Sequence, residues 1–132
     1  MKKIIILAFI FTVSLTIAQE KAIFQFETEI IDYGNILKDS DGKRFFEFIN
    51  TGKAPLIITQ IQASCGCTIP KKPEKPIMPG EKGIIEVSYD TKRLGGFSKM
   101  ITIYSNAKTT RKTLRIKGFV KKKNESIEKL NR

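Results

Sequence analysis

The sequence predicts an all-β protein, a single immunoglobulin-like β-sandwich of about seven strands. Three observations carry this prediction. Short runs alternate apolar and polar residues with a period of two, the pattern of half-buried strands. Turn signals rich in Gly, Pro, Asn and Asp separate these runs. No segment before residue 121 repeats its apolar residues every 3.6 positions. A closed β-barrel is the alternative architecture for such a pattern.

The first half of the chain supplies four of the expected elements. Residues 22–27 and 30–36 predict a first strand pair or one kinked strand. In residues 43–50, alternation places Phe46 and Phe48 on one face and Glu47 on the other. Residues 56–64 predict the strand that follows. The turns are expected at residues 39–42 and 50–52.

The second half alternates most regularly. Strands are expected at residues 83–91, 97–105 and 113–120, with turns at residues 79–80, 95–96 and 105–106. The side chains expected to face inward are those of Ile85, Val87, Tyr89, Ile101, Ile103, Leu114, Ile116 and Val120. The last residues, 121–132, are polar and aperiodic, so we expect a basic, flexible C-terminal tail.

The first 18 residues have the layout of a secretory signal peptide. Lys2 and Lys3 precede an uncharged apolar run from Ile4 to Ile17, and the segment ends in the small residue Ala18. The run is shorter than the roughly 20 residues that span a bilayer. We therefore expect cleavage after Ala18, an exported sandwich over residues 19–120, and no membrane span after cleavage. The expected location is the periplasm, the cell surface or the extracellular space.

Composition excludes several classes of function. The chain has 132 residues, which suits one domain, and it contains no His. Without His there is no Ser-His-Asp or Cys-His triad and no His-ligated zinc site. No arrangement of nucleophile, base and oxyanion donor is visible for a hydrolase. We expect no catalytic residues, no cofactor and no metal site.

Charge bears on the partners. The formal net charge is +11, or +9 without Lys2 and Lys3. The positive residues gather at Lys71-Lys72, at residues 111–117 and at residues 121–123. This excess fits either a solvated, Lys-rich sheet face that resists aggregation or contact with an anionic partner. No recognition helix or interleaved aromatic and basic residues indicate nucleic acid. The expected partner is another envelope protein or an anionic glycan, and the oligomeric state stays open.

Several motifs together resemble one bacterial family. They are Phe46-Glu47-Phe48-Ile49-Asn50-Thr51-Gly52, Pro55-Leu56-Ile57-Ile58, Ser64-Cys65-Gly66-Cys67-Thr68, Pro79-Gly80-Glu81-Lys82-Gly83, Tyr89-Asp90-Thr91, Gly95-Gly96-Phe97-Ser98-Lys99 and Ser105-Asn106-Ala107. In this order they resemble the DUF1573 family, domains of unknown function, from about Phe26 to Val120. The resemblance implies a secreted or envelope protein with a sandwich similar to the major-sperm-protein fold. Modules of that fold bind other proteins and have no catalytic site, so the resemblance implies no chemistry.

Cys65 and Cys67 are the only two cysteines, and they are the thiol or disulfide candidates. In an extended strand, residues i and i+2 are about 6.6 Å apart, whereas a disulfide needs Cβ atoms roughly 3.5–4.5 Å apart. A bond between them therefore requires a sharp turn, which we expect Gly66 to permit. So short a loop predicts a strained, easily reduced bond that stabilises the fold little.

Four interpretations of the pair remain open. The cysteines could be small, half-buried residues at a strand end, whether reduced or oxidised together. They could form a redox-active or sensing pair, or ligate Cu(I), which soft sulfur ligands favour. They could also form bonds to other molecules. Met78 and Met100 could assist copper, but nothing in the sequence places them near the cysteines. The Cys-x-Cys spacing differs from the Cys-x-x-Cys of thioredoxin-type centres.

The sequence therefore predicts an exported, non-enzymatic interaction module of the bacterial cell envelope. The alternative is a periplasmic thiol-redox or copper-handling protein that uses Cys65 and Cys67.

Overall fold

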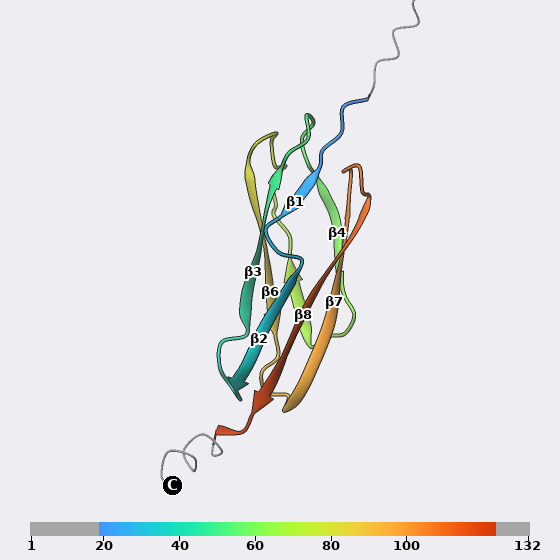
Figure 1. Ribbon diagram of the computed structural model, residues 1–132. Coiled ribbons are helices and arrows are strands. Elements are labelled where there is room, and N and C mark those ends of the chain that lie inside the picture. Colours follow the sequence, from blue (N-terminus) through green and yellow to red (C-terminus); the bar gives the residue numbers. More distant parts are fainter. Residues whose placement is uncertain (1–18, 124–132) are drawn as a thin grey trace, which may run out of the picture.

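The computed structural model describes residues 19–123, and the expected signal peptide and residues 124–132 lie outside this range. Eight strands form a sandwich: β1 (Phe24–Phe26), β2 (Ile30–Leu37), β3 (Lys43–Asn50), β4 (Ile58–Ala63), β5 (Thr68–Lys71), β6 (Lys82–Tyr89), β7 (Gly95–Ser105) and β8 (Arg111–Lys121). Sheet I has the order β1-β3-β6-β5 and sheet II the order β2-β8-β7-β4 (Figure 1). Strand pairs are antiparallel except β2 with β8, which is parallel. The predicted all-β, immunoglobulin-like class is confirmed.

Two details of the predicted strands are wrong. Residues 22–27 and 30–36 are neither a pair nor one kinked strand, because β1 pairs with β3 in sheet I and β2 pairs with β8 in sheet II. A period of two shows which residues form a strand but not which strand is its partner. The strand β5 was not expected, because it has only four residues and includes Pro70. It lies at the edge of sheet I, where a missing N–H is tolerated.

The core lies between the two sheets. All the side chains expected to face inward from the three later strands are buried, at 0–6% exposure. Phe46 and Phe48 of β3 are also buried, at 0% and 1%, whereas Glu47 lies on the outer face. Burial of such side chains is worth about 1.5–3 kcal/mol each relative to an exposed position. The inward and outward alternation predicted from the sequence is therefore confirmed.

One buried amide organises the end of the sandwich where the N-terminal segment enters. The side-chain oxygen of Asn50 accepts the N–H of Ile23 at 3.2 Å and that of Gly52 at 3.0 Å. Its nitrogen donates to the carbonyls of Ala54 at 2.8 Å and Ile77 at 2.9 Å. Asn50 is fully buried and joins three loop segments. The Asn-Thr-Gly motif therefore has a structural explanation.

Aromatic rings fill the opposite end. Tyr33 of β2 packs edge-on against Phe97 and Tyr89, with ring centroids 5.3 and 6.4 Å away. The Arg44 guanidinium lies 4.2 Å from the centre of the Tyr33 ring, and the Tyr33 hydroxyl donates to the Gly42 carbonyl at 2.8 Å. Burial raises the pKa of Tyr33 to about 12. These contacts close the flank of the sandwich between β2 and β3.

Candidate functional site

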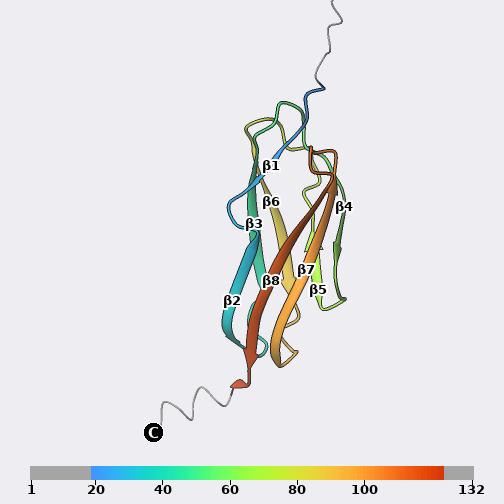
Figure 2. The same cartoon turned by 45° about the vertical axis from the view of Figure 1, so that its right-hand side comes forward.

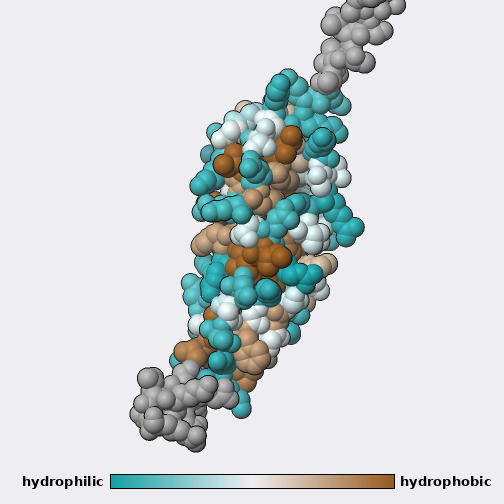
Figure 3. All heavy atoms as spheres, viewed as in Figure 1, coloured by the Kyte–Doolittle hydropathy of each residue, from teal (hydrophilic) through white to brown (hydrophobic). Residues whose placement is uncertain are grey.

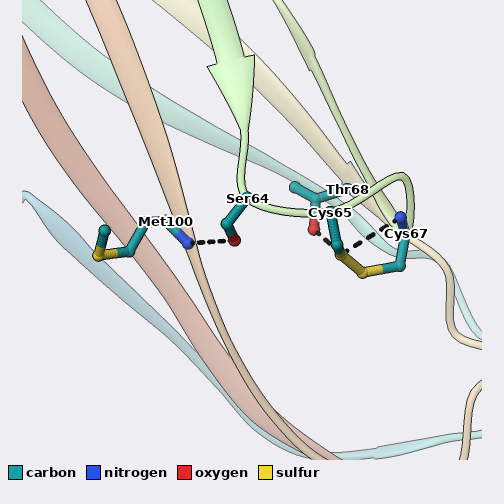
Figure 4. The surroundings of a disulfide bond; sticks show 5 residues. All are labelled: Ser64, Cys65, Cys67, Thr68 and Met100. Atoms are coloured by element: carbon teal, nitrogen blue, oxygen red, sulfur yellow. Dashed lines mark hydrogen bonds between the residues drawn. A yellow bond between two sulfur atoms is a disulfide. The ribbon is translucent and has the colours of Figure 1, made fainter.

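Cys65 and Cys67 are joined by a disulfide in the connection between β4 and β5 (Figure 4). Their Cα atoms are 5.3 Å apart. The Cys67 N–H points to the Cys65 sulfur at 3.3 Å, and the Thr68 N–H donates to the Cys65 carbonyl at 3.4 Å, which closes a tight turn. Cys67 is 5% exposed, whereas Cys65 is half-buried against the core. Of the two sulfur-bearing residues, Cys65 is the more accessible.

Gly66 lies in this turn as expected, but the turn does not depend on a glycine at that position. Gly66 does not adopt a positive φ, and an added Cβ would meet no atom within 4 Å. The turn is therefore open to an L-residue with a side chain, and neither packing nor backbone conformation requires glycine here. The consequence is open space beside the disulfide.

The disulfide turn carries the chain from one sheet to the other. β4 is an edge strand of sheet II, and β5 is an edge strand of sheet I. The turn is held on both sides, because Ser64 donates its N–H to the Met100 carbonyl at 2.9 Å and Cys67 accepts the Asp90 N–H at 2.9 Å. The two edge strands and the turn between them form what we call the β4–β5 flank (Figure 2).

The outer edge of β4 has no strand beside it within residues 19–123. Ser64 directs its N–H to β7, and pairing continues at Gln62 and Gln60, so alternation directs the backbone groups of Ile61 and Ala63 away from β7. An irregularity between Ile58 and Gln60 interrupts the pairing at the start of β4. The free edge therefore offers hydrogen-bonding groups at two alternate residues.

A hollow of about 480 Å³ lies between the two edge strands. It is lined by Thr59, Gln60, Ile61, Pro70, Lys71, Lys72 and Glu74. Its lining residues from β4 are uncharged, and those from β5 and the segment after it include two lysines and one glutamate. The sequence singled out Lys71-Lys72 as a cluster of charge but missed Thr59 and Ile61. A feature of the sequence could have pointed to Thr59 and Ile61, because residues 58–63 form the longest strand without a charged residue.

The four edge strands differ in how they resist pairing with another chain. β1 has only three residues, and β5 carries Pro70 and Lys71. β2 carries Asp32 and a bulge between Asp32 and Asn35. Short strands, prolines, charges and bulges are devices that discourage edge pairing. β4 has an irregularity at its start but neither proline nor charge, so it is the least protected edge.

The described residues do not assemble a copper site at the disulfide. The Met100 side chain points away from the sulfur atoms in Figure 4. Met78 precedes the start of β6, whereas Cys67 contacts Asp90 just past its end, so the two lie at opposite ends of that strand. Within residues 19–123, no group of three or more Cys, Asp or Glu side chains is placed to hold a metal ion. The same part of the chain contains no helix long and apolar enough to cross a membrane.

Comparison with known families and structures agrees with this fold. A family model described as a protein of unknown function (DUF1573) matches residues 24–120. No curated protein matches the sequence. A protein of unknown function from Porphyromonas gingivalis superimposes with a TM-score of 0.66 at 15% identity, covering 74% of this chain and 46% of that one.

Two further structures have the same type of sandwich. The PapD-like domain 7 of human CEP192 gives a TM-score of 0.57 at 8% identity and covers 77% of this chain and 87% of that one. A CsuC–CsuE chaperone–tip adhesion subunit complex of Acinetobacter baumannii gives 0.54 at 16% identity, covering 76% and 58%. The chain thus spans about half the length of the two bacterial structures. At these identities the likeness establishes the fold alone.

Proposed function

The chain belongs to the DUF1573 family, whose function is unknown, and we propose that it is a non-enzymatic interaction module exported to the bacterial cell envelope. The module binds an extended segment of another envelope protein along the free edge of β4. The observation that carries this proposal is the β4–β5 flank, where the least protected edge strand borders a hollow.

The chemistry of the flank suits such a partner. An added strand would pair with the backbone groups of Ile61 and Ala63, which gives affinity without requiring a particular sequence. Its alternate side chains would enter the hollow beside Thr59 and Ile61. Lys71 and Lys72 outnumber Glu74 there, so an acidic segment is favoured.

The envelope location rests on the signal-peptide layout of residues 1–18. The disulfide supports it, because such bonds persist in oxidising compartments outside the cytosol. Structural neighbours from pilus chaperones and secreted proteases are compatible with it.

The test is crosslinking in intact cells of the native host, followed by capture of the protein from the envelope. Ala63→Pro removes an outward N–H and leaves the pairing with β7 in place. Lys71→Glu with Lys72→Glu reverses the charge of the hollow. We expect both changes to lower the yield of the crosslinked partner at least about tenfold, as expected when binding weakens by 1.4 kcal/mol.

The matched control is Lys53→Glu with Lys108→Glu, which makes the same change in net charge at exposed positions away from the flank. This control should capture the partner as the wild type does. Equal capture by all three variants would mean that the partner binds elsewhere. No crosslinked partner in the wild type would remove the proposal.

A second function, thiol–disulfide exchange, is favoured by one observation. The Cys65 residue is half-buried, and the space beside Gly66 is open because no atom lies within 4 Å of an added Cβ there. A thiolate of a partner could attack the Cys65 sulfur, which forms a mixed disulfide and releases the Cys67 thiolate. A second thiol of the partner would then attack the mixed disulfide, which forms the partner's own disulfide and releases the Cys65 thiolate. Gly66→Val should then slow reduction by a dithiol protein while leaving the fold intact. An unchanged rate would argue for a purely structural disulfide.

A further inference from the structure

A larger hollow, of about 620 Å³, lies on the outer face of sheet II. It spans β2, β8 and residues 96–98 of β7, whereas β4 pairs with residues 101–105 of β7. Figure 3, drawn from the side on which β2, β8 and β7 lie in front, shows mostly hydrophilic and neutral residues with separate brown patches. The hollow is a shallow surface feature lined by both apolar and polar residues, and it is distinct from the β4–β5 flank.

Strand register arranges the outward residues of this hollow in two rows. Asp32, Lys117 and Ser98 lie opposite one another in the first row. In the second row Phe119 lies between Asn35 of β2 and Gly96 of β7. The rows combine one aromatic ring, four polar side chains and one position without a side chain.

Phe119 and Gly96 form the apolar part. Phe119 is 46% exposed, so its ring offers apolar surface to a ligand. A Cβ added to Gly96 would lie 3.6 Å from the Cδ2 atom of Phe119, so the ring extends over the bare strand there. An added Cβ would therefore make only ordinary contacts, and packing does not require a glycine. The glycine leaves the ring lying along the sheet with an exposed surface.

The polar groups around the ring are held in place by the sheet. Asp32 accepts the N–H of Gly34 at 2.8 Å, across the bulge where Gly34 has a φ of 64°. Ser98 accepts a hydrogen bond from Arg115 at 2.6 Å. Lys117 lies 3.9 Å from Asp32, and both side chains are more than half exposed, so this ion pair is weak and open to exchange.

We infer that this hollow binds a sugar ring that carries a carboxylate, the hexuronic-acid type found in anionic glycans. The face of a pyranose ring that bears C–H groups stacks on an exposed aromatic ring such as Phe119. Its hydroxyls need side chains that both donate and accept, which Asn35 and Ser98 provide. Its carboxylate would pair with Lys117, beside Arg115, on a chain whose formal net charge is +9 without Lys2 and Lys3.

The test is a titration of the ¹⁵N-labelled protein with trigalacturonic acid, followed by amide chemical shifts. We expect shifts confined to residues 32–35, 96–98 and 117–119. Phe119→Ala should weaken binding at least about tenfold. Lys117→Gln should weaken it by a smaller factor and reduce its dependence on salt. Gly96→Val should abolish binding, because the valine side chain would cover the floor of the hollow beside the Phe119 ring.

Phe45→Ala is the matched control, because Phe45 is 53% exposed on the outer face of sheet I, away from the hollow. This variant should bind as the wild type does. Ala63→Pro should also bind normally, which separates this site from the function proposed for β4. An absence of shifts, shifts elsewhere, unchanged binding by Phe119→Ala, or equal binding of neutral galactotriose would each overturn the inference.

Discussion

The side-chain nitrogen of Asn50 donates a hydrogen bond of 2.9 Å to the carbonyl oxygen of Ile77, which lies 27 residues further along the chain. Ile77 in turn exchanges two backbone hydrogen bonds with Leu56, at 2.8 and 2.9 Å. One buried amide thus fixes the loops before β4 and before β6 relative to each other.

Asn50→Ala should destabilise the protein by about 3 kcal/mol or more, because it leaves several backbone groups without partners in a buried place. Asn50→Asp should cost at least as much, since a carboxylate would face the carbonyls of Ala54 and Ile77. Urea unfolding followed by circular dichroism measures the change. Asn35→Ala, at an exposed asparagine, should stay within about 0.5 kcal/mol of wild type. A similar small effect at Asn50 would contradict the role given to it.

Gly83→Ala should destabilise the fold by about 1–3 kcal/mol, because the added Cβ would lie within 3 Å of the buried Phe48 ring. Gly118→Ala should act similarly, since its Cβ would lie 2.8 Å from the Tyr33 Cβ atom and 2.9 Å from the Phe97 ring. Gly96→Ala, with 3.6 Å to its nearest neighbour, is the control. Thermal unfolding of the three variants should separate the first two from the third.

The stability of the protein should fall between pH 10 and pH 12 in a way that depends on Tyr33. Burial raises the pKa of Tyr33 to about 12 from an ordinary value of 10.0, so the folded state keeps a proton that the unfolded state loses. The pKa shift of Tyr33 contributes at most about 2–3 kcal/mol to the free energy of unfolding. This contribution is complete below pH 10 and is lost as the pH rises towards 12. Urea midpoints measured across this range should fall less steeply in Tyr33→Phe. Parallel slopes would contradict the prediction.

Replacing both Cys65 and Cys67 by Ser should cost only about 1–2 kcal/mol, because the bond closes a loop of three residues and restricts the unfolded chain little. Unfolding midpoints with and without reductant measure this change. Intact mass of protein from its own envelope, before and after reduction and alkylation, should show one internal disulfide at these residues. Two thiols that alkylate without reductant would contradict the bond, and a loss above about 4 kcal/mol would contradict its local role.

Strand positions and the faces of the strands followed from the sequence, because alternation directly reports which side chains meet water. Tyr89, Ile103 and Leu114 were placed inward for this reason, and they are buried. The pairing of β1 and β2 did not follow, because the same alternation is satisfied by any partner strand. β5 was not predicted because it contains Pro70, and proline argues against a strand unless the strand is known to lie at an edge.

The candidate sites divide in the same way. Cys65 and Cys67 were identified from the sequence, since rare residue types are visible without a structure. The sequence did not link Thr59 and Ile61 with Lys71. They belong to strands of different sheets, and only the crossing of the chain from one sheet to the other brings them to the same flank. The sequence likewise did not connect Phe119 with Gly96. They are 23 positions apart in the chain, and only the register of β7 with β8 places them opposite each other.

The sequence by itself determined the fold class, the family resemblance, the inward faces of the strands and the cysteine pair. These depend on local chemistry and on periodicity along the chain. The tertiary structure alone decided which strands are edges, that β2 runs parallel to β8, and which surface residues face a common hollow. These depend on contacts between residues far apart in the chain. The free energy of such contacts depends on both segments together, so the sequence of either segment alone does not reveal them.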